Sequence, residues 1–331
     1  MFSSEFKWML DEEVKAKSFF VGHSIDILST VADGLKLNVR ETLRSIIKEH
    51  DIDIVYMHNV HPALNAFLSR ISRQKQVRFV QHIHEPFVED KSVYGGLQQF
   101  WLYLFEHAQE RILRSTDIAI VSSDEGMRLF DKRYPFFKGR KMQIPLMYED
   151  LAESNGFDPE RTFVTFIGPP SLAKGSDMFL KIVSYAATHA PELKFQVISR
   201  KEIRDSRFSE LPNLRVYFKD RISDDEFGVQ LKKSIVTLAP YITARQSSSV
   251  LTSFMYGVPV IGTEIGGLKE VIRNSETGYL ISPGATPEEW ISAIRDVRNA
   301  LPRMSLDCRA SYEREFSESN WQKYLEELLN G

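Results

Sequence analysis

Three short segments combine glycine with hydroxyl or basic residues where a strand-like run gives way to a helical one. The first is 168–175 (GPPSLAKG), which begins at Gly168 and follows the apolar run that ends at Ile167. A helix starting there would offer unpaired backbone N–H groups and the positive end of its dipole, which suit a phosphate. Lys174 would add a charge at the same place. The alternative is a plain strand-to-helix turn, because the segment fits neither a Walker A loop nor GxGxxG.

The second segment, 239–257 (APYITARQSSSVLTSFMYG), leads from a buried run through a hydroxyl-rich loop into a helical pattern. Any of its serines, Ser247, Ser248 or Ser249, could cap that helix through the side-chain oxygen. Their hydroxyls and neighbouring N–H groups could equally hold a diphosphate. Taken alone, this loop favours capping.

The third segment, 258–270 (VPVIGTEIGGLKE), contains the pair Gly266–Gly267 between a short strand and a helix start. Such a pair predicts a loop packed closely against a ligand or a neighbouring backbone, although glycines at these turns are commonly structural. All three segments follow strands of one half of the chain. Because ligands of open parallel sheets bind beyond the carboxyl ends of the strands, the three together indicate a binding site.

The elements that must position these loops alternate along the chain. Short β-branched runs read as buried parallel strands, and amphipathic runs between them read as helices. The strands are expected at 53–57, 77–82, 117–122, 162–167, 194–198, 214–218, 235–239, 259–262 and 278–281. The helices are expected at 35–50, 95–114, 177–190, 224–233, 248–256, 268–273, 288–300 and 317–329.

Strand–helix alternation of this kind predicts an α/β fold with parallel sheets flanked by helices. The strands fall into two groups separated by the polar stretch between Pro145 and Arg161. We therefore expect two Rossmann-like domains, 1–150 and 151–315, and a C-terminal helical segment, 316–331. A cleft between the domains would hold the main site.

Composition narrows the class of protein. The 331 residues are 43% hydrophobic and 26% charged, with a formal net charge of −3, so nothing in the global charge predicts binding to nucleic acid. The single cysteine, Cys308, cannot form an internal disulfide, and the sequence opens without a secretory apolar run. These features predict a cytoplasmic protein. Because no run approaches the roughly 18 apolar residues of a membrane span, membrane association would be peripheral, at the inner face.

The run Phe100, Trp101, Tyr103 and Phe105 is the most aromatic part of the first half. It could seat a lipid-linked acceptor at a membrane face. The helical spacing of Leu97, Trp101, Leu104 and Ala108 is also that of a helix facing its own core, and we expect the core.

The region 163–284 resembles the donor-binding half of glycosyltransferase family 4, the retaining group 1 enzymes of GT-B fold. The stretches that carry the resemblance are FIGPPSLAKGSDMFL, APYITARQSSSVLTSFMYGVPVIGTEIGGLKEVI and ETGYLISPG. The first half is similar in outline through DIDIVYMHN, RFVQHIHEPF and STDIAIVSSDEGMRLF. The resemblance implies an acceptor-side first domain, a second domain that binds a nucleotide-sugar, and a C-terminal helix that crosses back onto the first domain.

The resemblance also implies roles for single residues. Lys174 matches the family's phosphate-binding lysine, and the turn Arg221–Ile222 matches the loop that contacts the base through its backbone. His84, in HIHEP, falls where such enzymes often carry a histidine near the reacting sugar, although a structural histidine is the alternative. His58 and His82 are expected to be packing or surface groups. The family's GG-x-x-E element corresponds to Gly266, Gly267 and Glu270.

Several positions depart from the family pattern. Pro169 stands where the family has an arginine, and proline supplies neither a charge nor an N–H donor. Ala244 and Thr252 stand where the family has two glutamates, so Thr252 would bind donor hydroxyls only weakly. A Q-S-G-like variant occurs among similar proteins, and Gln246–Ser247–Ser248 resembles it. The first 20 residues show no strand with a glycine-rich loop of the kind that faces the acceptor.

The leading hypothesis is a metal-independent glycosyltransferase without a cofactor. It would move a sugar from a nucleotide diphosphate-sugar to a saccharide, lipid-linked or protein acceptor, with retention of configuration. The rival is a non-catalytic GT-B-like subunit that binds a partner glycosyltransferase, which the departures from the family pattern favour. A sugar-nucleotide epimerase is a third hypothesis, weakened by the lack of a dedicated acid–base pair.

Overall fold

The computed structural model describes residues 37–58, 71, 77–92, 94–152, 160–219, 222–244 and 247–330. These residues form two compact units. The first comprises Met1–Val121 with Met127–Gln143, and the second comprises Ser122–Gly126 with Ile144–Gly331. The predicted residues Arg221 and Gln246, and the first 20 residues, lie outside the described part of the chain.

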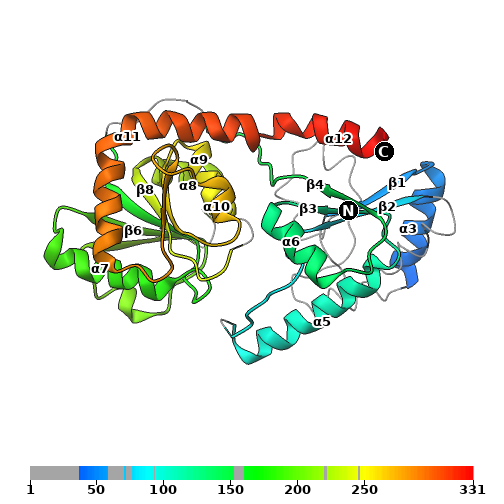
Figure 1. Cartoon of the computed structure of the whole chain (residues 1–331), viewed down its shortest axis with the longest axis horizontal. Helices are drawn as coiled ribbons and strands as arrows, with labels where there is room; N and C mark the ends of the chain where they lie inside the picture. The colour runs from blue at the N-terminus through cyan, green and yellow to red at the C-terminus, as the bar shows by residue number, and fades with distance from the viewer. Residues whose placement is uncertain are drawn as a thin grey trace. The chain divides into compact units, whose positions relative to one another are not determined.

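The first unit is built on a parallel sheet with the strand order β1-β2-β3-β4. The strands are β1 (Ile54–Met57), β2 (Arg78–Ile83), β3 (Ile118–Val121) and β4 (Arg140–Gln143). The helices are α3 (Leu37–Glu49), α5 (Gly96–Leu113) and α6 (Asp124–Arg133), the last of which begins in the segment grouped with the second unit (Figure 1). Strand β4 was not predicted, because only Met142 of its four residues is buried and the strand lies at the edge of the sheet.

Helix α5 does not face a core along its first turns, so that expectation was wrong. Leu97, Phe100 and Tyr103 are 73%, 55% and 62% exposed. The buried residues of α5 are Gln109, Ile112 and Leu113, all in its last turns. Helical spacing identifies an apolar face, but whether another element covers that face depends on the tertiary structure.

The second unit has a six-stranded parallel sheet with the order β10-β9-β8-β5-β6-β7. The strands are β5 (Phe163–Ile167), β6 (Lys194–Ser199), β7 (Leu214–Phe218), β8 (Ser234–Ala239), β9 (Val260–Thr263) and β10 (Gly278–Ile281). All six residues of β8 are buried, as is usual for a strand covered by helices on both faces. Every strand predicted for this half is confirmed.

Helices cover this sheet on both faces (Figure 1). One apolar cluster joins β5, β6 and β8 to α7 (Ser176–His189) and the first half of α11 (Pro287–Glu315). A second cluster includes α8 (Asp224–Lys232), α9 (Ser248–Met255), α10 (Leu268–Val271) and the second half of α11. The structure also contains the short helices η2 (Ser206–Phe208) and η3 (Glu318–Asn320) and the terminal helix α12 (Trp321–Asn330).

Helix α11 extends far beyond the predicted 288–300. It begins with a capping box, in which the Thr286 side chain accepts from the N–H of Glu289, and it continues through Pro302. The buried side chains of Cys308 and Tyr312 anchor its second half in the core. Tertiary burial thus carries the helix past a proline that ordinarily ends one.

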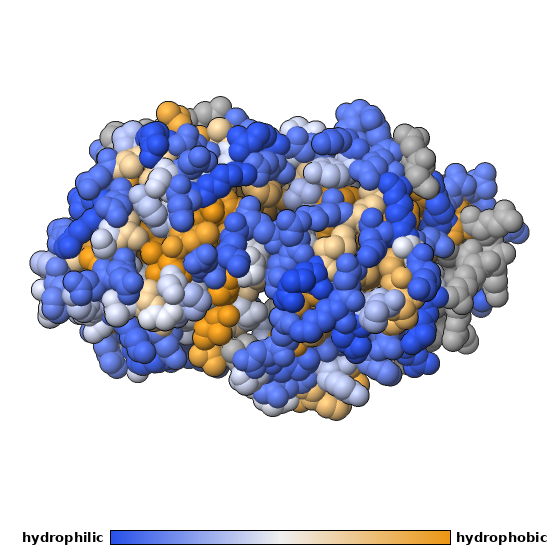
Figure 2. Space-filling view, viewed as in Figure 1, coloured by the Kyte–Doolittle hydropathy of each residue, from blue (hydrophilic) through white to orange (hydrophobic). Residues whose placement is uncertain are grey.

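No described helix is both long and apolar enough to cross a membrane. Figure 2 shows polar and charged side chains over most of the visible face of each unit, with apolar side chains gathered in separate patches. Patches of this kind are normal on a folded protein surface.

Candidate functional site

The strand order of the second unit creates a switch point between β5 and β8. The chain proceeds from β5 outward through β6 and β7, then returns to β8 and proceeds the other way through β9 and β10. After β5 and after β8 the chain therefore continues toward opposite edges of the sheet. Such a point is where open α/β sheets bind their ligands.

The loop after β5 is shaped by two glycines in the left-handed region. Gly168 has a φ of 91° and Gly175 a φ of 66°. A Cβ at Gly175 would lie 1.7 Å from the carbonyl oxygen of Pro240, so this turn fits only glycine. Lys174 folds back over the strand end, and its Nζ donates to the carbonyl of Ile167 at 3.3 Å.

The loop after β8 is joined to the loop after β5. The N–H of Ile242 donates to the carbonyl of Ala173 at 2.9 Å. Ser247 is the N-cap residue of α9 by its backbone, but its hydroxyl makes no capping bond. That hydroxyl instead donates to the hydroxyl of Tyr241 at 3.3 Å. Capping by the Ser247 side chain, the ordinary role expected from sequence, is therefore wrong.

The other hydroxyls of this segment have different surroundings. Ser248 is exposed, and its side chain hydrogen-bonds Tyr148. Ser249 is buried, and its carbonyl accepts from the hydroxyl of Ser253 at 2.7 Å. Thr252 is half-buried on α9. Ser247 and Ser248 thus lie at the start of the helix, while Thr252 lies one turn further along it.

The loop after β9 closes on the loop after β8. The N–H of Gly267 donates to the carbonyl of Ala244 at 3.1 Å. Gly266 has a φ of 37°, and a Cβ there would lie 2.0 Å from the same carbonyl. The Gly-Gly pair is therefore required by a close backbone approach. Ala244 makes this contact through its main-chain carbonyl, so the contact does not depend on its side chain.

Glu270, in α10, has a carboxylate engaged by main chain. Its two oxygens accept from the N–H groups of Asp124 and Glu125, each at 2.8 Å, in the segment grouped with the second unit. Burial raises the pKa of this carboxyl, and the two backbone bonds act in the opposite direction. Contacts among the three loops thus join the segments that contain the predicted residues Gly168, Lys174, Ser247, Gly266 and Gly267, and Ser248 is the first residue of α9.

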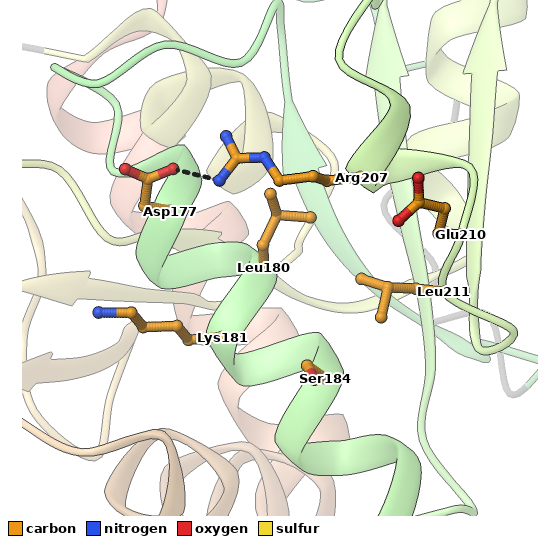
Figure 3. A pocket seen from close by; sticks show the side chains of 7 residues that line it. All are labelled: Asp177, Leu180, Lys181, Ser184, Arg207, Glu210 and Leu211. Carbon is orange, nitrogen blue, oxygen red and sulfur yellow. Dashed lines mark hydrogen bonds and ion pairs between the residues drawn. The ribbon is translucent and has the colours of Figure 1, made fainter.

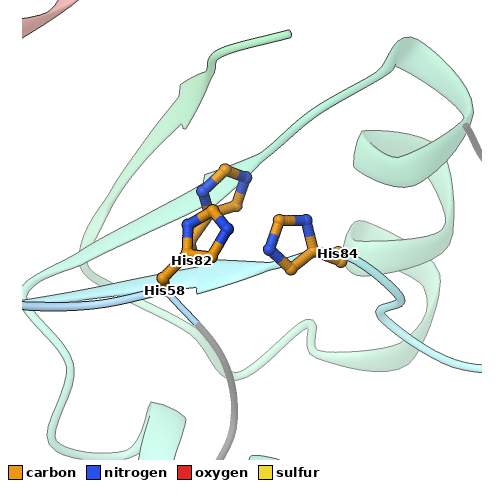
Figure 4. A group of neighbouring side chains, drawn as sticks. All are labelled: His58, His82 and His84. Atoms are coloured by element: carbon orange, nitrogen blue, oxygen red, sulfur yellow. The ribbon is translucent and has the colours of Figure 1, made fainter. Parts of the chain in front are cut away.

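A different kind of cluster lies at the carboxyl ends of β1 and β2 in the first unit. The imidazoles of His58, His82 and His84 gather there, with one ring nitrogen from each within 4.8 Å of the others (Figure 4). The hydroxyl of Tyr56 lies 2.7 Å from Nδ1 of His82. The rings of His82 and His84 stack with centroids 4.3 Å apart.

The three imidazoles are held in their neutral form at neutral pH. Burial, followed by the neighbouring His84 and His58, lowers the pKa of His82 to about 2. Burial and His58 lower the pKa of His84 to about 4. Burial also lowers the pKa of His58 and raises the pKa of Tyr56 to about 12. Neutral imidazoles can accept a hydrogen bond or bind a metal ion through the free nitrogen.

Of the three histidines, only His84 was predicted as a site residue, and His58 and His82 were expected to be packing or surface groups. His82 is buried, but it is part of the cluster. A signal was available, because residues two apart on a strand point to the same face, which pairs His82 with His84. The position of His58 needed the register, in which Met57 lies opposite Gln81.

Each unit has a hollow in its described surface. One, of about 310 Å³, is lined by His82 and His84 together with side chains of α5, among them Phe105 and Gln109. The other, of about 460 Å³, lies between α7 and η2 in the second unit (Figure 3). Its guanidinium, Arg207, is paired with Asp177 at 3.0 Å and with Asp205 at 2.7 Å. This pairing neutralises the charge that would otherwise attract an anion.

Solved structures share this fold. Sucrose-phosphate synthase from Thermosynechococcus elongatus matches with a TM-score of 0.70 at 14% identity, over 93% of this chain and 80% of that one. Anabaena Alr3699/HepE in complex with UDP matches with a TM-score of 0.65 at 13% identity, over 90% and 83%. These neighbours have the GT-B fold, which confirms the predicted fold class.

Curated relatives match over part of their length. The D-inositol 3-phosphate glycosyltransferase of Rhodococcus jostii (strain RHA1) is 25% identical over 185 residues, 53% of this chain and 40% of that one. The sulfoquinovosyl transferase SQD2 of Arabidopsis thaliana is 22% identical over 202 residues, 59% and 36%. The chain thus spans less than half the length of these curated relatives.

Family models match both halves of the chain. Residues 6–145 match Glycosyltransferase Family 4, and residues 161–299 match Glycosyl transferases group 1. The second match contains all three loops of the switch point. Each half of the chain matches a glycosyltransferase family model, and the fold is GT-B. The chain therefore belongs to the group 1 glycosyltransferases of family 4.

Proposed function

We propose that this protein transfers a sugar from a nucleotide diphosphate-sugar to an acceptor, and that the second unit binds the donor. The observation that carries the proposal is the joining of three loops at the switch point of the sheet. Gly175 and Gly266 allow the backbones to approach so closely that no side chain fits between them. The result is a rigid rim of main-chain groups at the place where α/β folds bind phosphates.

This rim can contribute to catalysis mainly by stabilising negative charge on the leaving diphosphate. Negative charge develops on the leaving diphosphate as the bond to the sugar breaks, and pre-arranged donors lower the free energy of that state. Lys174 donates to a neutral carbonyl in the structure, at 3.3 Å. A diphosphate would offer it a stronger, charge-assisted bond. The N-terminal ends of α7 and α9 would add their dipoles, so we expect transfer at these loops without a metal ion or a cofactor.

His84 is the residue that we propose beside the reacting sugar. It directly follows β2, at the carboxyl edge of the first sheet. A neutral imidazole there can accept a hydrogen bond from a sugar hydroxyl. Saccharide, lipid-linked and protein acceptors all agree with the family, and so does retention of configuration.

Calorimetric titration with UDP, UDP-glucose, UDP-N-acetylglucosamine and GDP-mannose tests donor binding. Removing the charged donor in Lys174→Ala should weaken binding of the preferred nucleotide about 10- to 100-fold. Lys181→Ala removes an exposed lysine of the following helix α7, so it is the control and should leave the affinity unchanged. Equal affinities in the two variants, or no binding of any of these compounds at millimolar concentration, would contradict the proposal.

A non-catalytic subunit that binds a partner glycosyltransferase is the second candidate. It is favoured by Pro169, Ala244 and Thr252, because neither the family's arginine nor its glutamates are present. One structural neighbour is described as the GtfA/B complex, with a TM-score of 0.63. Turnover by the purified chain alone, lost in Lys174→Ala, would exclude this candidate. Turnover only after addition of a co-purifying glycosyltransferase would favour it.

A further inference from the structure

Three imidazoles converge on one point at the carboxyl edge of the first sheet. His82 is the last but one residue of β2, His84 follows that strand, and His58 follows the adjacent strand β1. Among the described residues, this is the one group of three or more metal-binding side chains that gathers so closely. Parallel pairing of β1 with β2 fixes the separation of the three backbone positions.

The spacing is close to that of a three-histidine metal site. Imidazole nitrogens bound to zinc at about 2.0–2.1 Å in a tetrahedron lie about 3.4 Å apart. The nitrogens here all lie within 4.8 Å of one another. His82 is buried, whereas His58 is exposed and His84 half-exposed. The two outer rings, which are in contact with solvent, are therefore the ones that could adjust to an ion.

Two of the imidazoles already have the partners that orient a metal ligand. The hydroxyl of Tyr56 holds Nδ1 of His82 at 2.7 Å, and the His84 ring hydrogen-bonds the main chain of His58. Each bond restrains the orientation of one ring of the cluster. Metal-binding histidines commonly have such an outer partner, which fixes the orientation of the ring.

We infer that His58, His82 and His84 form a binding site for a divalent transition-metal ion, with Zn²⁺ as its ligand. Three neutral nitrogen donors without a carboxylate suit zinc and its first-row neighbours, whereas Mg²⁺ and Ca²⁺ require oxygen. Three protein ligands leave a fourth position open. That position is accessible from the hollow of about 310 Å³ that His82 and His84 line. The ion would fasten the end of β1 to the end of β2, and the His84 imidazole would accept from a sugar hydroxyl only while the ion is absent.

The test uses the full chain, freed of any histidine tag and treated with a chelator, without nucleotide. Titration with Co²⁺ should produce the visible absorption of four-coordinate cobalt at one ion per chain, and excess Zn²⁺ should abolish it. Zn²⁺ should also raise the Tm by an amount that grows with the logarithm of its concentration. Because no donor is present, the result is independent of the proposed sugar transfer.

Three variants separate the site from adventitious binding. His82→Phe preserves the buried volume and should lose the cobalt spectrum and the zinc-dependent shift in Tm. Tyr56→Phe removes only the outer partner and should weaken Zn²⁺ binding about 10- to 100-fold. His107→Phe replaces an exposed histidine of α5 outside the cluster and should change neither measurement.

The cobalt spectrum and the zinc-dependent shift in Tm can each support or overturn the metal site. A tetrahedral cobalt spectrum that His82→Phe abolishes and His107→Phe retains supports it. Absence of the spectrum and of any shift in Tm up to millimolar Zn²⁺ would overturn it, as would equal binding in all variants. If His82→Phe fails to fold, Tyr56→Phe decides, because a purely structural role for the cluster predicts unchanged zinc affinity in that variant.

Discussion

The two units build their carboxyl-edge sites from different parts of the chain. In the second unit, main-chain contacts join three loops, and glycines make those contacts sterically allowed. In the first unit, the site consists of side chains, three imidazoles and a tyrosine hydroxyl held by ring contacts and hydrogen bonds. One sheet edge therefore works through backbone shape and the other through side-chain chemistry.

This difference predicts how each site responds to mutation. A main-chain site is part of the fold, so a substitution that distorts it should reduce stability and binding together. A side-chain site can lose a functional group while the sheet beneath it stays intact. When stability and function are measured independently, substitutions at the main-chain site should lower both, whereas substitutions at the side-chain site should lower function alone.

Gly175→Ala should have the largest effect. Its Cβ would lie 1.7 Å from the Pro240 carbonyl oxygen, and its φ of 66° is strained for alanine. We expect the free energy of unfolding to fall by about 3 kcal/mol and nucleotide binding to become undetectable by calorimetry. Urea denaturation measures the first quantity. Gly284→Ala, where no atom lies within 4 Å of the added Cβ, should be nearly neutral, and similar losses in both would contradict the backbone argument.

His84→Asn, in the first unit, should reduce function without reducing stability. We expect turnover of the nucleotide-sugar to fall about 100-fold, as when a positioned catalytic group is lost. The affinity for UDP and the Tm should stay close to those of the parent protein, because the donor loops belong to the other unit. Steady-state kinetics and calorimetry check the two halves of the prediction. His107→Asn is the control, and a loss of nucleotide affinity in His84→Asn would count against the separation.

Ser247→Ala and Thr286→Ala compare two N-cap residues of the second unit. Thr286 accepts a hydrogen bond from the N–H of Glu289, whereas the Ser247 hydroxyl makes no capping bond. Thr286→Ala should therefore lower the free energy of unfolding by about 1 kcal/mol and leave nucleotide binding unchanged. Ser247→Ala should barely alter stability but weaken nucleotide binding about fivefold. Equal losses of stability in the two variants would contradict this difference between the two N-cap residues.

The smallest effects concern ion pairs. The guanidinium of Arg309, 10% exposed, pairs with Asp150, whereas Lys132 and Glu89 of the first unit are 59% and 40% exposed. Asp150→Asn should cost about 1 kcal/mol at pH 7, discounted for the partial exposure of the carboxylate, and Glu89→Gln less than about 0.5 kcal/mol. Urea denaturation of both variants measures these costs.

The Asp150 contribution should depend on pH in a defined direction. The hydrogen bond from Arg309 lowers the pKa of Asp150 in the folded protein. Its contribution is therefore fully present above the unfolded pKa of about 3.9 and is lost as pH falls through the lower, folded pKa. The difference between the parent protein and Asp150→Asn should vanish in strongly acidic solution. A difference that persisted there would mean that the substitution acts through packing and not through the lost charge.

Much of the second unit was predictable from sequence because local signals agreed there. Apolar β-branched runs marked β5 and β8, and Gly168, Gly266 and Lys174 marked the loops between strands and helices. The first unit was harder. Strand β4 lacks the apolar run of a buried strand, because a single side chain of it is buried. The apolar face of α5 has a core-like spacing but faces solvent at Leu97 and Phe100.

The sequence by itself determined the alternation of strands and helices, the family, and the places where glycine was required. These properties depend on local periodicity and on the steric freedom of single residues. Only the tertiary structure decided that the Ser247 hydroxyl does not cap α9, that Gly266 accommodates the Ala244 carbonyl, and that His58 joins His82 and His84. Each of these depends on strand order or register, which brings together residues far apart in the chain and which no local pattern encodes.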